Sequence, residues 1–309
     1  MKKFIIMTDV QSDLSKELRE RFNIEYIEGH LTTPDGKEHK GILGWSGFDQ
    51  KEFFASLKNK KNTYTTSPAS PEEYKNKFIE FINQGYDVLS ISISSKLSGS
   101  YDFACQGRDL ALAEAKDAKI ICIDSKKYSN GIALMAINAS ILRSEGKTID
   151  EVAKWLEDHS RNIHQTGWLD DLSFVASKGR ISHPAAFFGQ LIGIKPLADF
   201  NPDGLVTVIG KAKGEKQAYS VIIDYIKAEI ENPQDQIILI AETNRYEKAL
   251  KLKELIETEI KPKEVILTTV FPSSAINVGP GLNAAYFLGK YTSDDLVEET
   301  KLLTSLLEK

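Results

Sequence analysis

Two short segments rich in small hydroxyl residues could together hold a negatively charged group. Residues 64–73 are YTTSPASPEE and residues 94–101 are SSKLSGSY, and a helix is expected to begin at each. Free backbone amides at a helix N-terminus, together with the helix dipole, attract an anion. Thr66 and Ser98 can donate hydroxyl hydrogens, and Gly99 lets the backbone approach a ligand closely. The two segments therefore predict a socket for one anionic head group.

A catalytic use of such residues is the alternative. Ser98 could be the nucleophile of a hydrolase, or Asp9 and Asp124 could serve a phosphotransferase. A serine nucleophile needs a base, and no histidine occurs between residues 40 and 158. The GxSxG, HExxH and GxxxxGK motifs are also absent, which favours binding over catalysis, although triad partners can be distant in sequence. Structural roles are expected instead for Asp9, Asp124, His164 and His183.

Composition is that of a water-soluble globular protein. The 309 residues are 41% hydrophobic and 27% charged, enough for a large core and two domains. A net charge of -5 gives no reason to expect nucleic acid as a partner. Cys105 and Cys122 lack CxxC or zinc-site spacing, which favours reduced thiols in the cytoplasm and no metal. No apolar run approaches the roughly 20 residues of a membrane span, so we expect only transient membrane contact.

The first half of the chain alternates short apolar runs with helical patterns. Ser70, Pro71 and Glu73 form a helix-start pattern with a capping box, and Thr148 and Glu151 form a second box. Strands are expected at residues 4–7, 24–27, 88–93 and 119–123, and helices at 15–22, 49–58, 71–82, 100–115, 132–143 and 149–155. Alternation at this spacing predicts a mainly parallel sheet covered by helices.

The second half predicts a mixed sheet, because residues 201–204 (Asn-Pro-Asp-Gly) form a hairpin turn signal between two strands. Strands are expected at residues 166–169, 193–197, 205–209, 237–241, 265–269 and 284–288, and helices near 215–231, 245–258 and 294–307. We therefore expect an α/β protein of two domains. The first, residues 1–163, has a parallel sheet; the second, residues 164–309, is α+β with a mixed sheet. The sequence leaves open whether the last helix returns to the first domain.

Seven segments along most of the chain carry a family resemblance. They are MTDVQSDLS (7–15), TTSPASPEEY (65–74), SSKLSGSYDFA (94–104), IDSKKYSNGIA (123–133), DDLSFVASKGRIS (170–182), IGIKPL (192–197) and VGPG (278–281). In this order and spacing they resemble the DegV family of bacterial fatty-acid-binding proteins, which includes the acyl-carrier subunits of fatty acid kinase. The resemblance implies a non-catalytic carrier without a cofactor, with one long-chain fatty acid buried between two domains. It also implies that Thr66 and Ser98 hold the carboxylate, with Ser67 and Gly99 beside them.

Three positions depart from the family pattern. Asn277, two residues before the Gly-Pro-Gly turn, stands where the family usually has histidine; asparagine can donate a hydrogen bond but cannot be charged. Pro68 replaces a glutamine, and the basic run is diluted at residues 211–216. The resemblance also implies a fatty acid kinase subunit as a partner, with Arg180 near the head-group entrance. The departures make fatty acid binding better supported than acyl-phosphate formation.

Overall fold

The structure is a computed structural model that describes residues 2–59, 61–182 and 193–309. Its contacts divide the chain into two compact units. Unit 1 consists of Met1–Phe48, Lys60–Ser160 and Phe271–Ser274, and unit 2 of Asp49–Asn59, Arg161–Val270 and Ala275–Lys309. Residues 49–59 of unit 2 interrupt the sequence of unit 1, and residues 271–274 of unit 1 interrupt the sequence of unit 2. The division into domains after residue 163 stays a prediction.

Unit 1 is built on a four-stranded parallel sheet, as predicted. The strands are β1 (Phe4–Asp9), β2 (Ile24–Ile27), β6 (Asp87–Ser92) and β7 (Ile120–Asp124), in the order β2-β1-β6-β7. All six residues of β1 and of β6 are buried, as expected for strands covered on both faces. The strand order reverses between β1 and β6, because β2 and β6 lie on opposite sides of β1.

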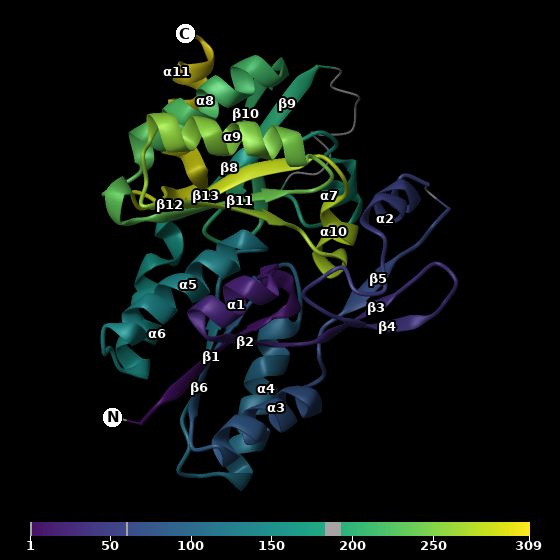
Figure 1. The fold of residues 1–309 in the computed structure, drawn as a ribbon, viewed down its shortest axis with the longest axis vertical. Coiled ribbons are helices and arrows are strands. Elements are labelled where there is room, and N and C mark those ends of the chain that lie inside the picture. Colours follow the sequence, from purple (N-terminus) through teal and green to yellow (C-terminus); the bar gives the residue numbers. More distant parts are fainter. Residues whose placement is uncertain (1, 60, 183–192) are drawn as a thin grey trace. The chain divides into compact units, whose positions relative to one another are not determined.

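Helices cover both faces of this sheet (Figure 1). The helices of unit 1 are α1 (Lys16–Phe22), α3 (Pro71–Asn83), α4 (Ser100–Glu114), α5 (Asn130–Ser144) and α6 (Ile149–His159), with the short η1 (Val10–Ser12). One buried cluster joins α3 and α4 to the sheet, and α5 and α6 pack on the strands elsewhere. Both predicted capping boxes, at Ser70 with Glu73 and at Thr148 with Glu151, are confirmed.

A small antiparallel sheet in unit 1 was not predicted. It consists of β3 (Gly29–Thr32), β4 (Glu38–Gly41) and β5 (Thr65–Ser67), in the order β4-β3-β5. Each strand has only three or four residues and is partly exposed, so it lacks the apolar run by which a buried strand is recognised. This sheet matters because β5 carries Thr66 and Ser67.

Unit 2 contains a six-stranded mixed sheet, again as predicted. Its strands are β8 (Ile163–Leu169), β9 (Ile194–Phe200), β10 (Val206–Lys213), β11 (Ile237–Glu242), β12 (Glu264–Thr269) and β13 (Leu282–Leu288). The order is β10-β9-β8-β13-β11-β12, and β11 with β12 is the parallel pair. The expected hairpin turn joins β9 to β10, with the Gly204 amide donating to the carbonyl of Asn201.

Three helices, α8 (Gly214–Glu229), α9 (Tyr246–Glu259) and α11 (Val297–Leu307), lie on one side of this sheet (Figure 1). The other helices and short turns outside unit 1's set are α2 (Gln50–Leu57), η2 (Ser160–Asn162), α7 (Ser173–Ser177), η4 (Pro233–Asp235), α10 (Pro272–Val278) and η5 (Asp294–Leu296). The last helix, α11, packs on α8 and β10 and so belongs to unit 2. Within the described part of the chain, no helix has the length and apolarity to cross a membrane.

Candidate functional site

The carboxyl ends of β1 and β6 form the edge of unit 1 where a ligand is expected. Thr8 pairs with Ile91, so Asp9 at the end of β1 lies beside the end of β6. In open parallel sheets, ligands bind outside the strands' carboxyl ends at the point where strand order reverses. That point lies between β1 and β6, and residues 93–99 leave β6 there.

Two carboxylates hold the turn that follows β6. The Ile93 amide donates to Asp9 Oδ2 at 2.8 Å, and the Ser95 amide donates to Asp124 Oδ1 at 3.1 Å. Asp9 Oδ1 also accepts from the Gln11 amide, at 3.0 Å. Burial raises the pKa of Asp9 to about 6, against the lowering effect of its two backbone hydrogen bonds. The structural roles predicted for Asp9 and Asp124 are confirmed, since each positions the turn.

Ser98 and Gly99 lie at the start of α4. Gly99, not Ser98, is the N-cap residue, with φ -75° and ψ 2°, and no side chain caps this helix end. The Ser98 hydroxyl oxygen accepts from the Ser100 amide at 3.2 Å and lies 2.9 Å from the Ser100 hydroxyl. Ser98 is therefore not the N-cap residue of α4. Ser98 is half-buried and Gly99 exposed, which leaves this helix end open to a ligand.

Thr66 and Ser67 reach the same edge through the small sheet. Thr66 is half-buried and Ser67 exposed, and Ser67 pairs with His30 of β3. A Cβ placed on Gly29 would lie 3.0 Å from the Ser67 carbonyl oxygen and 3.3 Å from Val10 Cγ1. The end of β5 therefore lies close to the residue that follows β1.

Helix α3, which follows the Thr66 segment, packs closely on α4, which follows the Ser98 segment. A Cβ on Gly107 would lie 2.5 Å from Tyr74 Cβ and 2.8 Å from the Pro71 carbonyl oxygen, so only glycine permits this approach. Helix α3 begins four residues after Ser67, and α4 begins directly after Gly99. The start of α3 therefore packs against α4 at Gly107, and the approach of Thr66 to Ser98 stays a prediction.

A buried acid that the sequence did not single out lies at this edge. Asp13 Oδ2 accepts from the Ser129 hydroxyl at 2.6 Å, and Asp13 Oδ1 accepts from the Phe271 amide at 2.9 Å. Burial raises the pKa of Asp13 to about 7, although these hydrogen bonds lower it. Ser274 is held nearby, because its hydroxyl donates to Gln11 Oε1 at 3.1 Å. Asp13 therefore anchors the short segment Phe271–Ser274 within unit 1.

Asn277 and Arg180 belong to unit 2. Asn277 lies in α10 and is half-buried, while Arg180 follows α7 and donates through Nη1 to the carbonyl of Lys178. Because Thr66 and Ser98 belong to unit 1, the predicted approach of Asn277 and Arg180 to the head group stays a prediction.

Unit 2 also contains an ion network that the sequence did not reveal. Asp170 accepts from Lys195 Nζ at 2.5 Å and from Arg245 Nε at 2.7 Å. Burial alone would raise the pKa of Asp170, but the hydrogen bonds from these two cations lower it below its usual value. The three residues lie in different segments of the chain, so no local motif identifies them.

A cavity of about 870 Å³ in unit 2 is lined largely by charged and polar residues. Its lining includes Lys51, Lys58, Glu242, Arg245 and Lys248. Burying such groups against an acyl chain without partners would cost several kcal/mol, about 2–7 for each polar group. This cavity contains none of the predicted site residues and does not suit a fatty acid tail.

The histidines differ in what the structure shows of them. His164 is fully buried, with Nδ1 3.0 Å from the Tyr225 hydroxyl and Nε2 2.8 Å from the Lys290 carbonyl oxygen. Its predicted structural role is confirmed. His183 lies outside the described residues. In the described part of the chain, no group of three or more His, Cys, Asp or Glu residues is arranged to hold a metal.

The protein is a two-unit α/β protein: one unit has a parallel sheet and the other a mixed sheet. A profile described as an uncharacterised protein of the DegV family matches residues 3–290. A DegV domain-containing protein of Clostridium perfringens is 30% identical over 289 residues, covering 94% of this chain and 98% of that protein. The chain belongs to the DegV family.

Solved structures of the family have the same fold. A DegV family protein from Thermus thermophilus, described for its fatty acid binding, has a TM-score of 0.82 at 25% identity and covers 94% of this chain and 100% of its own. A DegV family protein from Ruminococcus gnavus, solved with vaccenic acid, has a TM-score of 0.80 at 22% identity and covers 92% of this chain and 99% of its own.

Proposed function

We propose that this protein binds a long-chain fatty acid and holds its carboxylate with Thr66 and Ser98, with Ser67 and Gly99 beside them. The observation that supports the proposal is that residues 93–99 leave β6 at the switch point of the unit 1 sheet, while the end of β5 lies close to Val10, which follows β1. The fatty acids described for the Thermus thermophilus and Ruminococcus gnavus proteins support the same ligand class.

Hydroxyl and amide donors are sufficient for such a head group. Each hydrogen bond to a carboxylate contributes about 1.5–3 kcal/mol, and a helix N-terminus adds a favourable dipole. Most of the affinity must then come from the buried tail, at roughly 0.8 kcal/mol per methylene. The protein on its own acts as a carrier, because the three carboxylates placed at this edge are all engaged in hydrogen bonds: Asp9 and Asp124 with backbone amides, and Asp13 with the Ser129 hydroxyl and the Phe271 amide.

The experiment is native mass spectrometry of the purified protein, followed by fatty acid titration of variants. Wild type should retain an acyl chain, and Thr66→Ala with Ser98→Ala should weaken binding at least about 100-fold through two lost hydrogen bonds. Thr63→Ala is the matched control, because Thr63 is an exposed threonine that lies outside β5. Equal retention by wild type and the double variant would show that the socket is elsewhere.

Asn277 is proposed to donate a neutral hydrogen bond to the same head group. Asn277→His should then add a titration step to fatty acid affinity near pH 6.5, because histidine becomes charged below that pH. The measurement is the dissociation constant from pH 5 to 8 for wild type and variant. Identical profiles would place Asn277 out of reach of the ligand.

We further propose that the carrier presents its fatty acid to a fatty acid kinase subunit, with Arg180 contacting that partner or its phosphate. A guanidinium suits phosphate oxygens through its planar fork. Arg180→Glu should leave fatty acid binding nearly unchanged and abolish acyl-phosphate formation with the host's own kinase subunit and ATP. No product from the wild type, where another carrier of the same host gives product, would limit the function to binding.

A further inference from the structure

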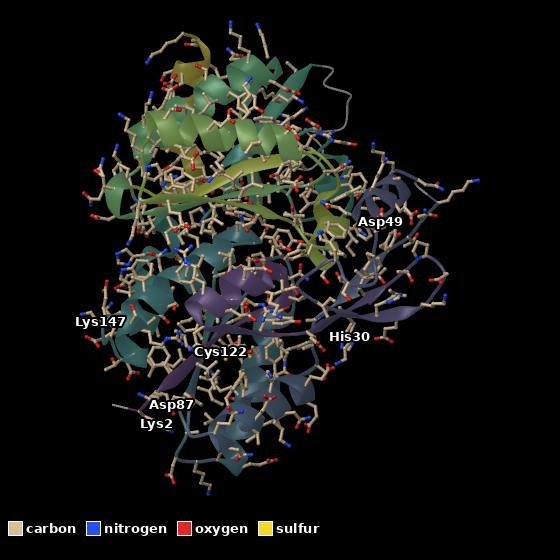
Figure 2. All side chains as sticks on the ribbon, in the orientation of Figure 1. Lys2, His30, Asp49, Asp87, Cys122 and Lys147 are labelled. Atoms are coloured by element: carbon tan, nitrogen blue, oxygen red, sulfur yellow. The ribbon has the colours of Figure 1, made fainter. Side chains whose placement is uncertain are left out.

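The two cysteines of the chain approach one another inside unit 1. Cys122, labelled in Figure 2, lies in β7. Cys122 and Ile120, which point to the same face of the strand, both belong to the buried cluster that joins the sheet to α3 and α4. Cys105 lies in α4, is half-buried, and packs against that cluster. Helix α4 packs directly on β7. Both cysteines are free, and both belong to or pack against this one cluster.

The surroundings of the two sulfurs differ. Tyr101 and Arg108 lie four residues before and three residues after Cys105, on the same face of α4. The hydrogen bond from Cys122 lowers the pKa of Cys105 to about 6, helped by the Tyr101 hydroxyl and the Arg108 charge and opposed by burial. The same thiol pair and burial raise the pKa of Cys122. Cys105 is therefore the more acidic and the more exposed of the two thiols.

We propose that Cys105 and Cys122 are a modification site, a dithiol that a hydroperoxide oxidises to a disulfide within the chain. The Cys105 sulfur attacks the distal oxygen of the peroxide, the O–O bond breaks, and water or an alcohol leaves with one proton. The Cys122 sulfur then attacks the sulfur of the resulting sulfenic acid, Cys105–SOH; the S–O bond breaks, and the hydroxyl leaves as water with the Cys122 proton. In sum, two thiols lose two electrons and two protons, and the peroxide is reduced.

The arrangement meets the requirements of this chemistry. An oxidisable cysteine is a thiolate, is reachable by solvent and is stabilised by nearby positive charge. Cys105 is half-buried, with Arg108 on its own helix face. A resolving thiol must lie beside it and must not itself react first, and Cys122 is 9% exposed. The acidic neighbour is Asp109, which accepts from Arg108 Nε at 2.9 Å and so opposes its effect only in part.

The test exposes the purified full-length protein to hydrogen peroxide and follows free thiols and mass. We expect both thiols to disappear together, with a loss of about 2 Da that dithiothreitol reverses. Peptide mapping should show Cys105 linked to Cys122 in the monomer. Oxygen addition without this link, or cross-linked dimers in its place, would overturn the proposal. Because this measurement uses the wild-type chain, it does not depend on the folding of any variant.

Variants separate the roles of the two sulfurs. Cys122→Ala should stop the reaction at a sulfenic acid on Cys105, which dimedone traps. Cys105→Ser should slow oxidation of the remaining Cys122 at least about tenfold, because that thiol is buried and protonated. Arg108→Gln should also slow the reaction, and the wild-type rate should fall as pH drops through about 6. Equal rates for wild type and Cys105→Ser would contradict the assignment of Cys105 as the reacting sulfur.

Discussion

Two polar regions of the molecule differ in how tightly they are packed. One is the corner of unit 2 with Asp170 and Gly281, and the other is the edge of unit 1 with Asp13 and Gly99. In unit 2, Gly281 has φ +116°, and a Cβ there would lie 2.6 Å from Asp170 Cβ. In unit 1, Gly99 has an ordinary φ of -75°, and a Cβ would meet only Phe103 Cζ, at 3.9 Å. At Gly281, both the positive φ and the close contact with Asp170 require glycine. At Gly99, neither φ nor a neighbouring atom requires glycine, as expected if the space beside this turn is kept for a ligand.

Asp170 and Asp13, the acids of the two regions, also differ in their partners and in the direction of their pKa shifts. Asp170 is paired with Lys195 and Arg245, which lower its pKa. Asp13 is fully buried with only hydroxyl and amide donors, and burial raises its pKa to about 7. The corner of unit 2 is therefore closed by charge and packing. The edge of unit 1 has a buried acid held by neutral hydrogen-bond donors and a helix end without a side-chain cap. A buried acid with a strongly shifted pKa is more frequent at functional sites than elsewhere.

The comparison is tested most strongly at Gly281. Gly281→Ala should destabilise the protein by about 3–5 kcal/mol, because an unfavourable φ and a clash with Asp170 add together. The measurement is the urea midpoint of unfolding. Gly36→Ala is the control: Gly36 also has positive φ, at +80°, but its Cβ would meet nothing within 4 Å. We expect about 1 kcal/mol there, and equal losses at the two sites would remove the packing part of the argument.

The two acids should respond to pH in opposite directions. The folded pKa of Asp13 is raised, so its stabilising contribution is present at low pH and is lost as pH rises from about 4 to 7. The folded pKa of Asp170 is lowered, so its contribution is present above pH about 4 and is lost as the pH falls further. Asp13→Asn should flatten the neutral side of the stability profile, and Asp170→Asn the acid side.

The size of the Asp13 effect should be a few kcal/mol, since one pKa unit corresponds to about 1.4 kcal/mol. Chemical denaturation at pH 5 and pH 8 measures it directly. Asp9, whose pKa is raised to about 6, contributes in the same direction, so Asp13→Asn should reduce the slope without abolishing it. A wild-type protein that is more stable at pH 8 than at pH 5 would contradict the raised pKa values.

Within unit 1, the sequence draws attention to the hydroxyl segments but not to the buried acid Asp13, for a physical reason. The segments around Thr66 and Ser98 are local and adjoin helix starts, so a reader of the sequence can single them out, and their role in binding stays a prediction. Asp13 could not be identified, because its partners Ser129 and Phe271 lie 116 and 258 residues away. The parallel and mixed sheets follow from apolar runs, whereas the small sheet that carries Thr66 has strands too short and too exposed to give that signal.

Oxidation of the dithiol should stabilise unit 1. A disulfide between Cys105 and Cys122 would close a short loop and restrict the unfolded chain, which should raise the free energy of unfolding by about 3 kcal/mol. Urea unfolding of the peroxide-treated protein, with and without dithiothreitol, measures this. Cys122→Ala treated identically is the control and should show no gain. A lower midpoint for the oxidised wild type would mean that α4 is distorted when it is joined to β7.

The smallest effect on folding is expected at Gly99, and there the comparison becomes sharpest. Gly99→Ala should change stability by no more than about 0.5 kcal/mol, because its φ suits alanine and no neighbour lies within 3.9 Å of the added Cβ. Fatty acid affinity should nevertheless fall several-fold, since the new methyl group occupies the open side of the helix end. Paired urea unfolding and fatty acid titration of this one variant separate the two effects. Unchanged affinity would show that the open space at Gly99 is not used by the carboxylate, and Ser98 would then have to bind it from another side.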